Sequence, residues 1–428
     1  MKTVAFHTLG CKVNQYDTEA MREAFLRAGY LDVPFSQDAD VYLVNTCTVT
    51  GTGDQKSLKM IRRVARAHPN AAIVAAGCLA QRDAEALFTI ENVRLVLGVK
   101  RRAQVVDLIE TALREGRRIN AVGSLEDAPF EDMRIERHAG RTRATMKIQE
   151  GCDRNCAYCI IPRVRGPVRS MPLSGVRDEA ARLADAGHRE IVLAGIHLAS
   201  YGRGTQDTLL DAIRAVHETG VRVRIGSLEP GIVTDSFAYA LSTLPHFMRQ
   251  FHLSLQSGSA GVLARMRRRY NPEQYEHALD TIRRFMPDSA ITTDILTGFP
   301  GETDAEHAQT MDFAARAGFA RLHVFPFSPR TGTPAAAMPD QIGEAVKRAR
   351  AAELIALGNK LEAAFVQGLE GTVQTVLFEA RVDELCEGES PQSVRVRAHA
   401  EPGEVVRVRI IRAEGATAYG EPFAKGGR

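Results

Sequence analysis

Short apolar runs alternate with segments of helical periodicity along most of this chain, and no other feature limits its possible folds as strongly. In the amino-terminal part the apolar runs lie at residues 3–7, 41–45 and 72–76, and a helical segment follows each of them. One such helix is expected from about Gln15 to Ala28. Because strand–helix alternation places parallel strands under covering helices, residues 1–122 are predicted to form an open parallel α/β sheet domain.

The alternation resumes after residues 123–137, which combine Gly, Pro and dense charge without periodicity and are interpreted as a linker. Further strands are expected at residues 145–149, 190–193, 221–225, 251–255, 291–295 and 322–325. These strand–helix units predict an open, partial (β/α)6 barrel over residues 138–366, with its chemistry at the carboxyl ends of the strands.

The carboxyl-terminal residues, 368–428, have a different character. Short β-branched runs at 373–378, 393–396 and 405–411 are separated by turns that contain Gly and Pro. This pattern predicts a small all-β barrel.

The cysteines and the absence of long apolar stretches narrow the class of protein. No stretch resembles a signal peptide or reaches the ~18 apolar residues of a spanning helix, so we expect a soluble, cytoplasmic protein without membrane association. In that reducing compartment, an odd set of 7 cysteines argues against a disulfide framework and favours metal or redox chemistry. The net charge of +3 does not decide whether the partner is nucleic acid.

Three of the cysteines, Cys152, Cys156 and Cys159, stand close together on one loop after an expected strand. Their C-x3-C-x2-C spacing allows three thiolates to bind three irons of a 4Fe-4S cluster and to leave the fourth iron open for a small molecule. The alternative is a structural zinc site, but such sites are closed by four ligands and no fourth Cys or His lies at a suitable spacing.

Three other cysteines, Cys11, Cys47 and Cys78, each lie just past the carboxyl end of an expected strand. Ligands collect at that edge of open α/β sheets, so these side chains could meet in space and hold a second cluster. The alternative is that each is a small apolar core residue. Cys386 lies apart from both triplets and is interpreted as structural or incidental.

The loop sequence Gly151 to Cys159, GCDRNCAYC, resembles the radical S-adenosylmethionine (radical-SAM) superfamily. The resemblance implies that the open iron chelates S-adenosylmethionine and that the reduced cluster splits it to a 5′-deoxyadenosyl radical. Tyr158 matches an aromatic position that lies near the adenine of the cofactor in that family. An ordinary core tyrosine is the alternative for this residue.

The resemblance extends over nearly the whole chain to the methylthiotransferase family of these enzymes. Its motifs are TLGCKVNQYDTE, VNTCTVT, AAGCLAQ, KIQEGCDRNCAYCIIPRVRGPVRS, LAGIHLASYG, HLSLQSGS and DILTGFPGET, followed by a barrel similar to a TRAM domain. The family implies that Cys11, Cys47 and Cys78 hold an auxiliary 4Fe-4S cluster. One S-adenosylmethionine would methylate a sulfur on that cluster, and a second would yield the radical.

The context of the first cysteine, GCKVNQYDTE, is similar to that of the threonylcarbamoyladenosine tRNA branch, as is LSLQSGSAGVLARMRRRY at residues 253–270. The implied substrate is the adenosine 3′ of the anticodon, methylthiolated at carbon 2. The alternatives are an isopentenyladenosine tRNA, a ribosomal protein or, in another class, a non-catalytic RNA-binding iron–sulfur protein. A purely structural cluster normally has four protein ligands, which speaks against the last.

Further contacts and partners are expected on weaker grounds. The candidate cofactor contacts at strand ends are Gly195, Glu229, Gln256 and Asp294, although each is also suited to turns or helix caps. An electron donor such as flavodoxin or ferredoxin and a sulfur donor are implied.

Clustered cations favour an RNA partner, the anticodon arm of tRNA, although charge runs are also common on solvated helix faces. They are Arg265, Arg267, Arg268 and Arg269, then Arg163, Arg165 and Arg169 after the cluster loop, and Arg381, Arg395 and Arg397 in the barrel.

Overall fold

The computed structural model describes residues 1–126, 129–136 and 141–423. Its amino-terminal sheet is parallel throughout, in the order β2-β1-β3-β4-β5-β6, as the sequence predicts. The elements are β1 (Thr3–Thr8), α1 (Lys12–Arg27), β2 (Leu31–Asp32), β3 (Val41–Thr46), α2 (Gly51–Ala67), β4 (Ala72–Gly77), α3 (Cys78–Arg82), α4 (Ala84–Phe88), β5 (Val93–Leu97), η1 (Arg102–Gln104), α5 (Val105–Arg114) and β6 (Ile119–Asn120).

Both faces of this sheet are buried, which explains why its strands are continuous apolar runs rather than alternating ones. In β3, Val41 and Leu43 belong to one core cluster, whereas Tyr42 and Val44 belong to the cluster on the opposite face. Successive strand residues point to opposite faces, so each strand contributes side chains to the cores on both sides of the sheet.

The segment interpreted as a linker contains no helix or strand in its described residues, 123–126 and 129–136. It is nevertheless packed on the amino-terminal domain, because Met133 and Ile135 are buried in one of that domain's cores. The Tyr16 hydroxyl donates a hydrogen bond of 2.7 Å to the Met133 carbonyl oxygen. Its residues 127, 128 and 137, and residue 138 where the next domain was expected to begin, lie outside the described residues.

The second domain is a partial barrel with six parallel strands, as expected. It divides into two sheets, β10-β9-β7-β8 and β11-β12-β13, joined by isolated bridges from Val223 to Phe247 and from Leu228 to Leu253. Its elements are β7 (Arg143–Glu150), α6 (Ile161–Arg165), β8 (Arg169–Ser170), α7 (Leu173–Asp185), β9 (Glu190–Gly195), η2 (Leu198–Ser200), α8 (Leu209–His217), β10 (Arg222–Ile225), η3 (Pro230–Ile232), α9 (Asp235–Ser242), β11 (Gln250–His252), α10 (Ala260–Arg265), α11 (Pro272–Phe285), β12 (Ala290–Thr297), α12 (Asp304–Ala317), β13 (Arg321–Pro326), η4 (Pro334–Ala337) and α13 (Glu344–Gln367).

A closed five-stranded barrel follows, in the order β14-β15-β16-β18-β17. Its strands are β14 (Val373–Val382), β15 (Leu385–Glu389), β16 (Arg395–Ala398), β17 (Val405–Glu414) and β18 (Thr417–Pro422). The sequence did not predict β15 and β18, because their Gly, Glu and Pro residues are poor strand formers and only barrel closure overrides that preference. Cys386 is buried in this barrel's core, and its thiol donates to the Ala380 carbonyl oxygen at 3.1 Å.

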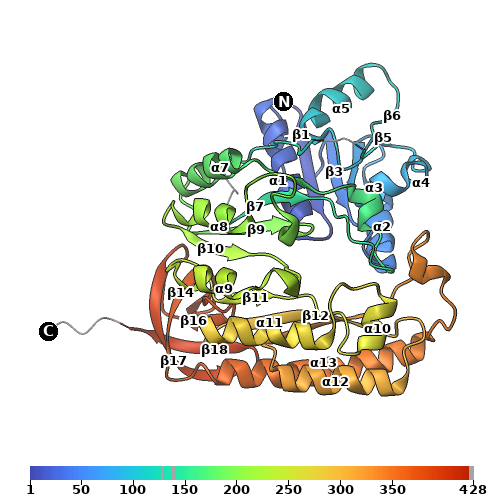
Figure 1. Cartoon of the computed structure of the whole chain (residues 1–428). Coiled ribbons are helices and arrows are strands. Elements are labelled where there is room, and N and C mark those ends of the chain that lie inside the picture. Colours follow the sequence, from blue (N-terminus) through green and yellow to red (C-terminus); the bar gives the residue numbers. More distant parts are fainter. Residues whose placement is uncertain (127–128, 137–140, 424–428) are drawn as a thin grey trace.

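Figure 1 shows the amino-terminal sheet in the upper half of the molecule, the helices α11, α12 and α13 along the lower half, and the small barrel at the side. The small barrel is joined to the partial barrel by ion pairs of Arg143 with Glu379 (2.7 Å) and Glu389 (2.6 Å). Among the described residues, no helix combines the length and apolar character needed to cross a membrane.

Candidate active site

The loop that carries Cys152, Cys156 and Cys159 leaves β7 and is held at several points. The Cys152 amide donates to the Gly166 carbonyl oxygen at 3.0 Å, the Ala157 amide to the Met266 oxygen at 2.9 Å, and the Ala335 amide to the Ala157 oxygen at 2.8 Å. Gly151 has φ +74°, and a Cβ there would lie 1.8 Å from the Pro167 oxygen. Only glycine fits this turn, and the turn fixes the direction in which the cysteine loop leaves β7.

The guanidinium of Arg268 contacts this loop. Its guanidinium donates to Cys156 Sγ at 3.1 Å, pairs with Glu229 at 3.0 Å and lies 4.8 Å from the centre of the Tyr270 ring. Burial raises the pKa of the Cys159 thiol to about 12. A cationic donor at a neighbouring sulfur favours the thiolate form that binds metal. The prediction that Arg268 faces RNA is therefore wrong. Only 6% of its side chain is exposed, and its guanidinium is bound to Cys156 and Glu229.

Cys11, Cys47 and Cys78 follow β1, β3 and β4, which are adjacent in the sheet. A Cβ on Gly10 would lie 3.1 Å from Cys47 Sγ, so the first two segments touch. The predicted meeting of these strand ends is confirmed, although α1 begins at Lys12 rather than near Gln15. Cys11 is the residue before the helix, and Gly10, with φ +102°, makes the turn from the strand.

Arg165 joins the second triplet to a buried ionic network. Its Nε donates to Cys78 Sγ at 3.2 Å, and its Nη1 pairs with Asp17 (3.1 Å) and Glu150 (2.6 Å). Its side chain is fully buried, so the expectation that Arg165 meets RNA is also wrong. Against the opposing effect of Arg165, burial raises the pKa of the Cys78 thiol to about 11.

The same network connects the two domains. Asp17 on α1 pairs with Lys147 on β7 at 2.5 Å, and Glu150 at the end of β7 pairs with Arg102 at 2.9 Å. These side chains are no more than 3% exposed. Although burial opposes it, Arg102, Lys147 and Arg165 lower the pKa values of the Asp17 and Glu150 carboxyls, so both stay ionised at neutral pH.

Neither cysteine triplet has the geometry of a site for a single metal ion. In the described part of the chain, no three His, Cys, Asp or Glu side chains converge on a point where one metal ion could bind. Thiolates that bind a 4Fe-4S cluster each contact a different iron, so they need not converge. Each triplet also has an arginine at hydrogen-bond distance from one sulfur.

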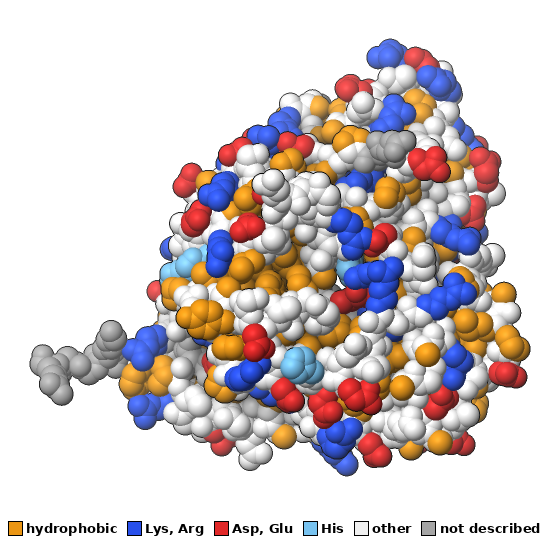
Figure 2. Space-filling model, viewed as in Figure 1, with side chains coloured by type: hydrophobic (Ala, Val, Ile, Leu, Met, Phe, Trp, Pro, Cys, Tyr) orange, Lys and Arg blue, Asp and Glu red, His pale blue; other side chains and the backbone are white. Residues whose placement is uncertain are grey.

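A cavity of about 850 Å³ opens between the three parts of the chain. Cys11, Lys12 and Val13 border it from the amino-terminal domain, and the strands β7, β9, β10, β11, β12 and β13 line it. Residues of the small barrel line its remaining side. Figure 2 shows Lys and Arg side chains gathered near the middle of this face, where the upper and lower halves of Figure 1 meet. The volume is that of a pocket for a nucleoside-sized ligand.

Of the five expected cofactor contacts, two line the cavity and two lie beside the loop triplet. Gly195 and Asp294 line the cavity, and a Cβ on Gly195 would come within 2.9 Å of Gln149 Oε1. Tyr158 and Glu229 lie beside the loop triplet: the Tyr158 ring meets Phe299 edge to face at 6.4 Å.

Glu229 is surrounded by basic side chains of the chain itself. It pairs with Arg154, His197 and Arg268 at 3.0 Å each. Burial would raise its pKa, but the His197 hydrogen bond and Arg268 outweigh burial and lower the pKa to about 2.

Gln256 has the geometry of a strained functional residue. Its φ is +71°, which is uncommon outside glycine. It is buried, its amide donates to the Asp294 carbonyl oxygen at 2.8 Å, and its side-chain oxygen has no hydrogen-bond partner in the described structure. Such a group is suited to contact a ligand.

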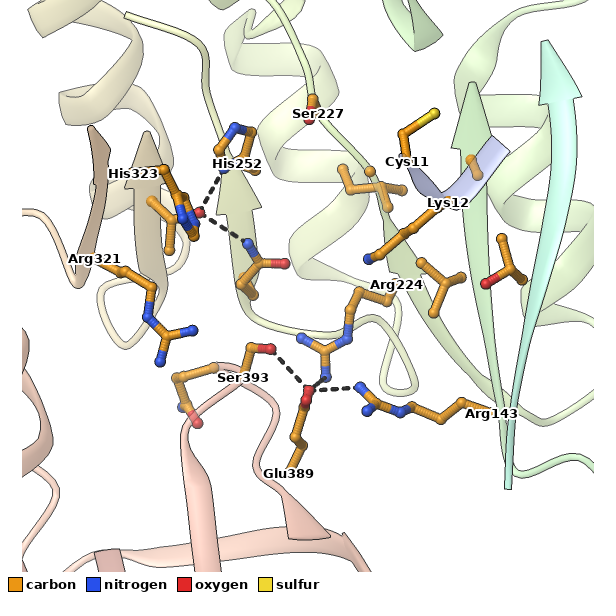
Figure 3. A pocket seen from close by; sticks show the side chains of 18 of the residues that line it. Cys11, Lys12, Arg143, Arg224, Ser227, His252, Arg321, His323, Glu389 and Ser393 are labelled. Atoms are coloured by element: carbon orange, nitrogen blue, oxygen red, sulfur yellow. Dashed lines mark hydrogen bonds and ion pairs between the residues drawn. The ribbon is translucent and has the colours of Figure 1, made fainter. Parts of the chain in front are cut away.

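Sequence reasoning missed the polar lining of the cavity. It includes Lys12, Arg143, Arg224, His252, Arg321 and His323 (Figure 3). The signal was present in strands such as RVRI at 222–225 and RLHVF at 321–325, where polar and apolar residues alternate. In a barrel, alternate residues face the interior, so polar ones at that register indicate a filled or liganded lumen.

The positions of the remaining basic residues are mixed. Arg267 and Arg269 are exposed, whereas Arg265 pairs with Glu306 at 2.7 Å. Arg163 is exposed and Arg169 is half-buried. In the small barrel Arg381 pairs with Glu401 (2.7 Å), and Arg395 and Arg397 pair with Glu387 (3.3 and 2.9 Å).

Comparisons with known proteins agree with this architecture. The model of the Radical SAM superfamily matches residues 146–314, and that of the Uncharacterized protein family UPF0004 matches residues 3–98. In solved structures, the radical S-adenosylmethionine methyltransferase TsrM from Kitasatospora setae has a similar fold, with a TM-score of 0.56 at 15% identity, over 78% of this chain and 74% of that chain.

Two curated relatives cover nearly the whole chain. The threonylcarbamoyladenosine tRNA methylthiotransferase MtaB of Bacillus subtilis is 40% identical, over 100% of this chain and 96% of that protein. The tRNA-2-methylthio-N(6)-dimethylallyladenosine synthase of Akkermansia muciniphila is 34% identical, over 99% of each. This chain therefore belongs to the radical-SAM methylthiotransferases, in their threonylcarbamoyladenosine tRNA branch, and is a tRNA-modifying enzyme that uses S-adenosylmethionine and 4Fe-4S clusters.

Proposed function

We propose that this enzyme methylthiolates carbon 2 of N6-threonylcarbamoyladenosine beside the anticodon, giving 2-methylthio-N6-threonylcarbamoyladenosine. The observation that carries the proposal is the cavity that Cys11 borders together with the barrel strands. It brings one strand end of the dispersed triplet to the space where a nucleoside could bind. The name of the 40% identical relative supports the choice of base.

In this proposal Cys152, Cys156 and Cys159 hold the radical-forming cluster, and Cys11, Cys47 and Cys78 hold the auxiliary one. Residues 1–122 are the auxiliary-cluster domain, residues 138–366 the radical-SAM core, and residues 368–428 a TRAM-like barrel. When bound, the cofactors supply the radical and the sulfur that the reaction needs, because no side-chain base removes an adenine C–H proton at neutral pH.

The chain's own residues prepare the site. Arg268 and Arg165 donate to cysteine sulfurs and so favour thiolate ligands. Tyr158, Gly195, Glu229, Gln256 and Asp294 are proposed to surround S-adenosylmethionine. Of these, Gln256 has the free buried oxygen that a ligand amine could satisfy, whereas Glu229 orients Arg154, His197 and Arg268 around the loop.

The partners follow from the chemistry. The substrate is the anticodon arm of tRNA, and a one-electron donor such as flavodoxin or ferredoxin and a sulfur donor would restore the enzyme between turnovers. A tRNA substrate also implies action in the cytoplasm.

The test offers the reconstituted enzyme transfer RNA with and without the threonylcarbamoyl group and measures methylthiolated nucleosides by mass spectrometry. The proposal predicts product only from the tRNA that carries the group. Equal product from both, or product only from isopentenyladenosine tRNA or a ribosomal protein, would overturn the choice of substrate. The isopentenyladenosine comparison matters because a relative with that activity in its name is 34% identical.

A further inference from the structure

We propose that Lys12 determines which adenosine the enzyme accepts, by binding a carboxylate carried on the N6 substituent of the target base. The inference rests on the proposed function and assigns the recognition step to one side chain of the cavity.

Lys12 has an unusual position for a surface lysine. It is the first residue of α1, directly after Cys11, and its side chain extends into the cavity rather than away from the molecule (Figure 3). No hydrogen bond or ion pair joins it to any other residue in the described ranges of the chain. A lysine that borders a cavity and forms no ion pair there is suited to bind an anionic ligand group.

The carboxylates around the cavity already have basic side chains as partners. Arg143 pairs with both Glu379 and Glu389. Asp294 pairs with His252 at 3.3 Å, and Glu362 pairs with Arg321. Glu389 and Glu190 also act on Lys12 through charge, but both are paired with arginines, so the Lys12 ammonium has no ion pair of its own among the described residues.

The chemistry of adenine places the N6 substituent near Lys12. Carbon 2 and N6 lie on the same edge of the ring, with only N1 and carbon 6 between them. If carbon 2 receives sulfur at the triplet that includes Cys11, the N6 substituent lies beside the next residue of the chain. A threonylcarbamoyl group carries a carboxylate there, whereas an apolar N6 group would leave the ammonium unpaired in the cavity, which disfavours that substrate.

The test pairs a change in the protein with a change in the RNA. Anticodon stem-loops carry either N6-threonylcarbamoyladenosine or the same group with its carboxylate converted to an amide, and binding to the reconstituted enzyme is measured anaerobically at one salt concentration. The wild type should prefer the carboxylate RNA by roughly 10- to 100-fold, the range for a hydrogen bond between charged groups. Lys12→Met should remove most of this preference, and Lys12→Arg should keep part of it.

Lys59→Met is the matched control, because Lys59 is an exposed lysine on α2 that does not border the cavity. It should keep the full preference. No preference in the wild type, an unchanged preference in Lys12→Met, or equal weakening of both RNAs by Lys12→Met would overturn the assignment. Lys12→Gln replaces Lys12→Met if the latter loses iron.

The same samples separate this inference from the proposed function. If the wild type methylthiolates the carboxylate RNA while Lys12→Met keeps the preference, only the role of Lys12 is wrong. If the wild type methylthiolates neither RNA, the proposed function itself is wrong.

Discussion

The two cysteine triplets are placed by different parts of the fold. Cys152, Cys156 and Cys159 stand within eight residues on one loop, and their spacing alone indicates the chemistry. Cys11, Cys47 and Cys78 are far apart in the sequence, and they follow β1, β3 and β4, which are neighbours in the sheet. The first site therefore depends on local turn geometry, and the second depends on the whole amino-terminal fold.

The arginines that donate to the two triplets also differ in which domain they come from. Arg268, beside the loop triplet, belongs to the same domain as the cysteine that it contacts. Arg165, beside the dispersed triplet, comes from the other domain and is held by a network that crosses the interface. The dispersed site is thus coupled to domain docking through the side chain of Arg165.

Replacing Cys152, Cys156 and Cys159 together with alanine should have the largest effect. The iron content of the reconstituted protein should fall from about eight to about four per chain, because one of two 4Fe-4S clusters loses its ligands. Cleavage of S-adenosylmethionine and methylthio transfer should both be lost. Iron analysis and product chromatography check this, and an unchanged iron content would contradict the assignment of the loop.

Arg165→Lys should weaken the dispersed site while keeping a positive charge in the buried network. We expect a 10- to 100-fold loss of transfer activity, roughly the range for residues that support metal ligands. Loss of the hydrogen bond to Cys78 Sγ should lower the reduction potential of the auxiliary cluster, since hydrogen bonds to sulfur favour the reduced form. Redox titration followed by electron paramagnetic resonance measures this, and an unchanged potential would mean that Arg165 only supports the fold.

Arg267→Gln together with Arg269→Gln should weaken tRNA binding by removing exposed cations beside the loop site. The slope of log affinity against log salt should become shallower by about 0.7 to 0.9 per lost phosphate contact. The measurement is a salt titration of binding. An unchanged slope would show that these arginines form a solvated helix end and do not meet RNA.

Glu179 should make the stability of the protein depend on pH. Burial raises its pKa from the usual 4.5 to about 8, although the Tyr16 hydrogen bond opposes this. Between these values the folded chain binds more protons than the unfolded chain, so stability falls as pH rises from about 4.5 through about 8. Glu179→Gln should flatten this decline in urea unfolding at pH 6 and 9.

Glu218→Gln serves as the control for that comparison, because Glu218 forms an exposed ion pair with Arg177. It should leave the decline as in the wild type. A Glu179→Gln variant with the same decline as the wild type would mean that other groups cause it.

The sequence predicted those features that rest on local patterns. The strand–helix alternation, the loop triplet and the strand ends at Cys11, Cys47 and Cys78 were all visible in it. The burial of Arg165 and Arg268 was not, because a run of basic residues has the same pattern whether it meets water, RNA or a partner carboxylate. Asp17 and Glu150, which neutralise Arg165, are 148 and 15 residues away from it.

The cavity was missed for a related reason. Its polar residues come from six strands and two other domains, and no window of sequence contains more than a few of them. Lys12 stood next to a predicted cluster ligand, but its direction depends on where α1 begins. That start depends on the Gly10 turn, which only the folded backbone reveals.

The division of roles between the triplets is tested most directly by one assay of a Cys11, Cys47 and Cys78 triple-alanine variant. Reconstituted with iron and sulfide, it is given S-adenosylmethionine, reductant and tRNA, and 5′-deoxyadenosine and methylthiolated nucleoside are measured in the same sample. We predict that 5′-deoxyadenosine still forms, because the loop triplet is intact, while the methylthio product is absent. Retained transfer would make the three residues ordinary core cysteines, and loss of both products would show that the two sites do not act separately.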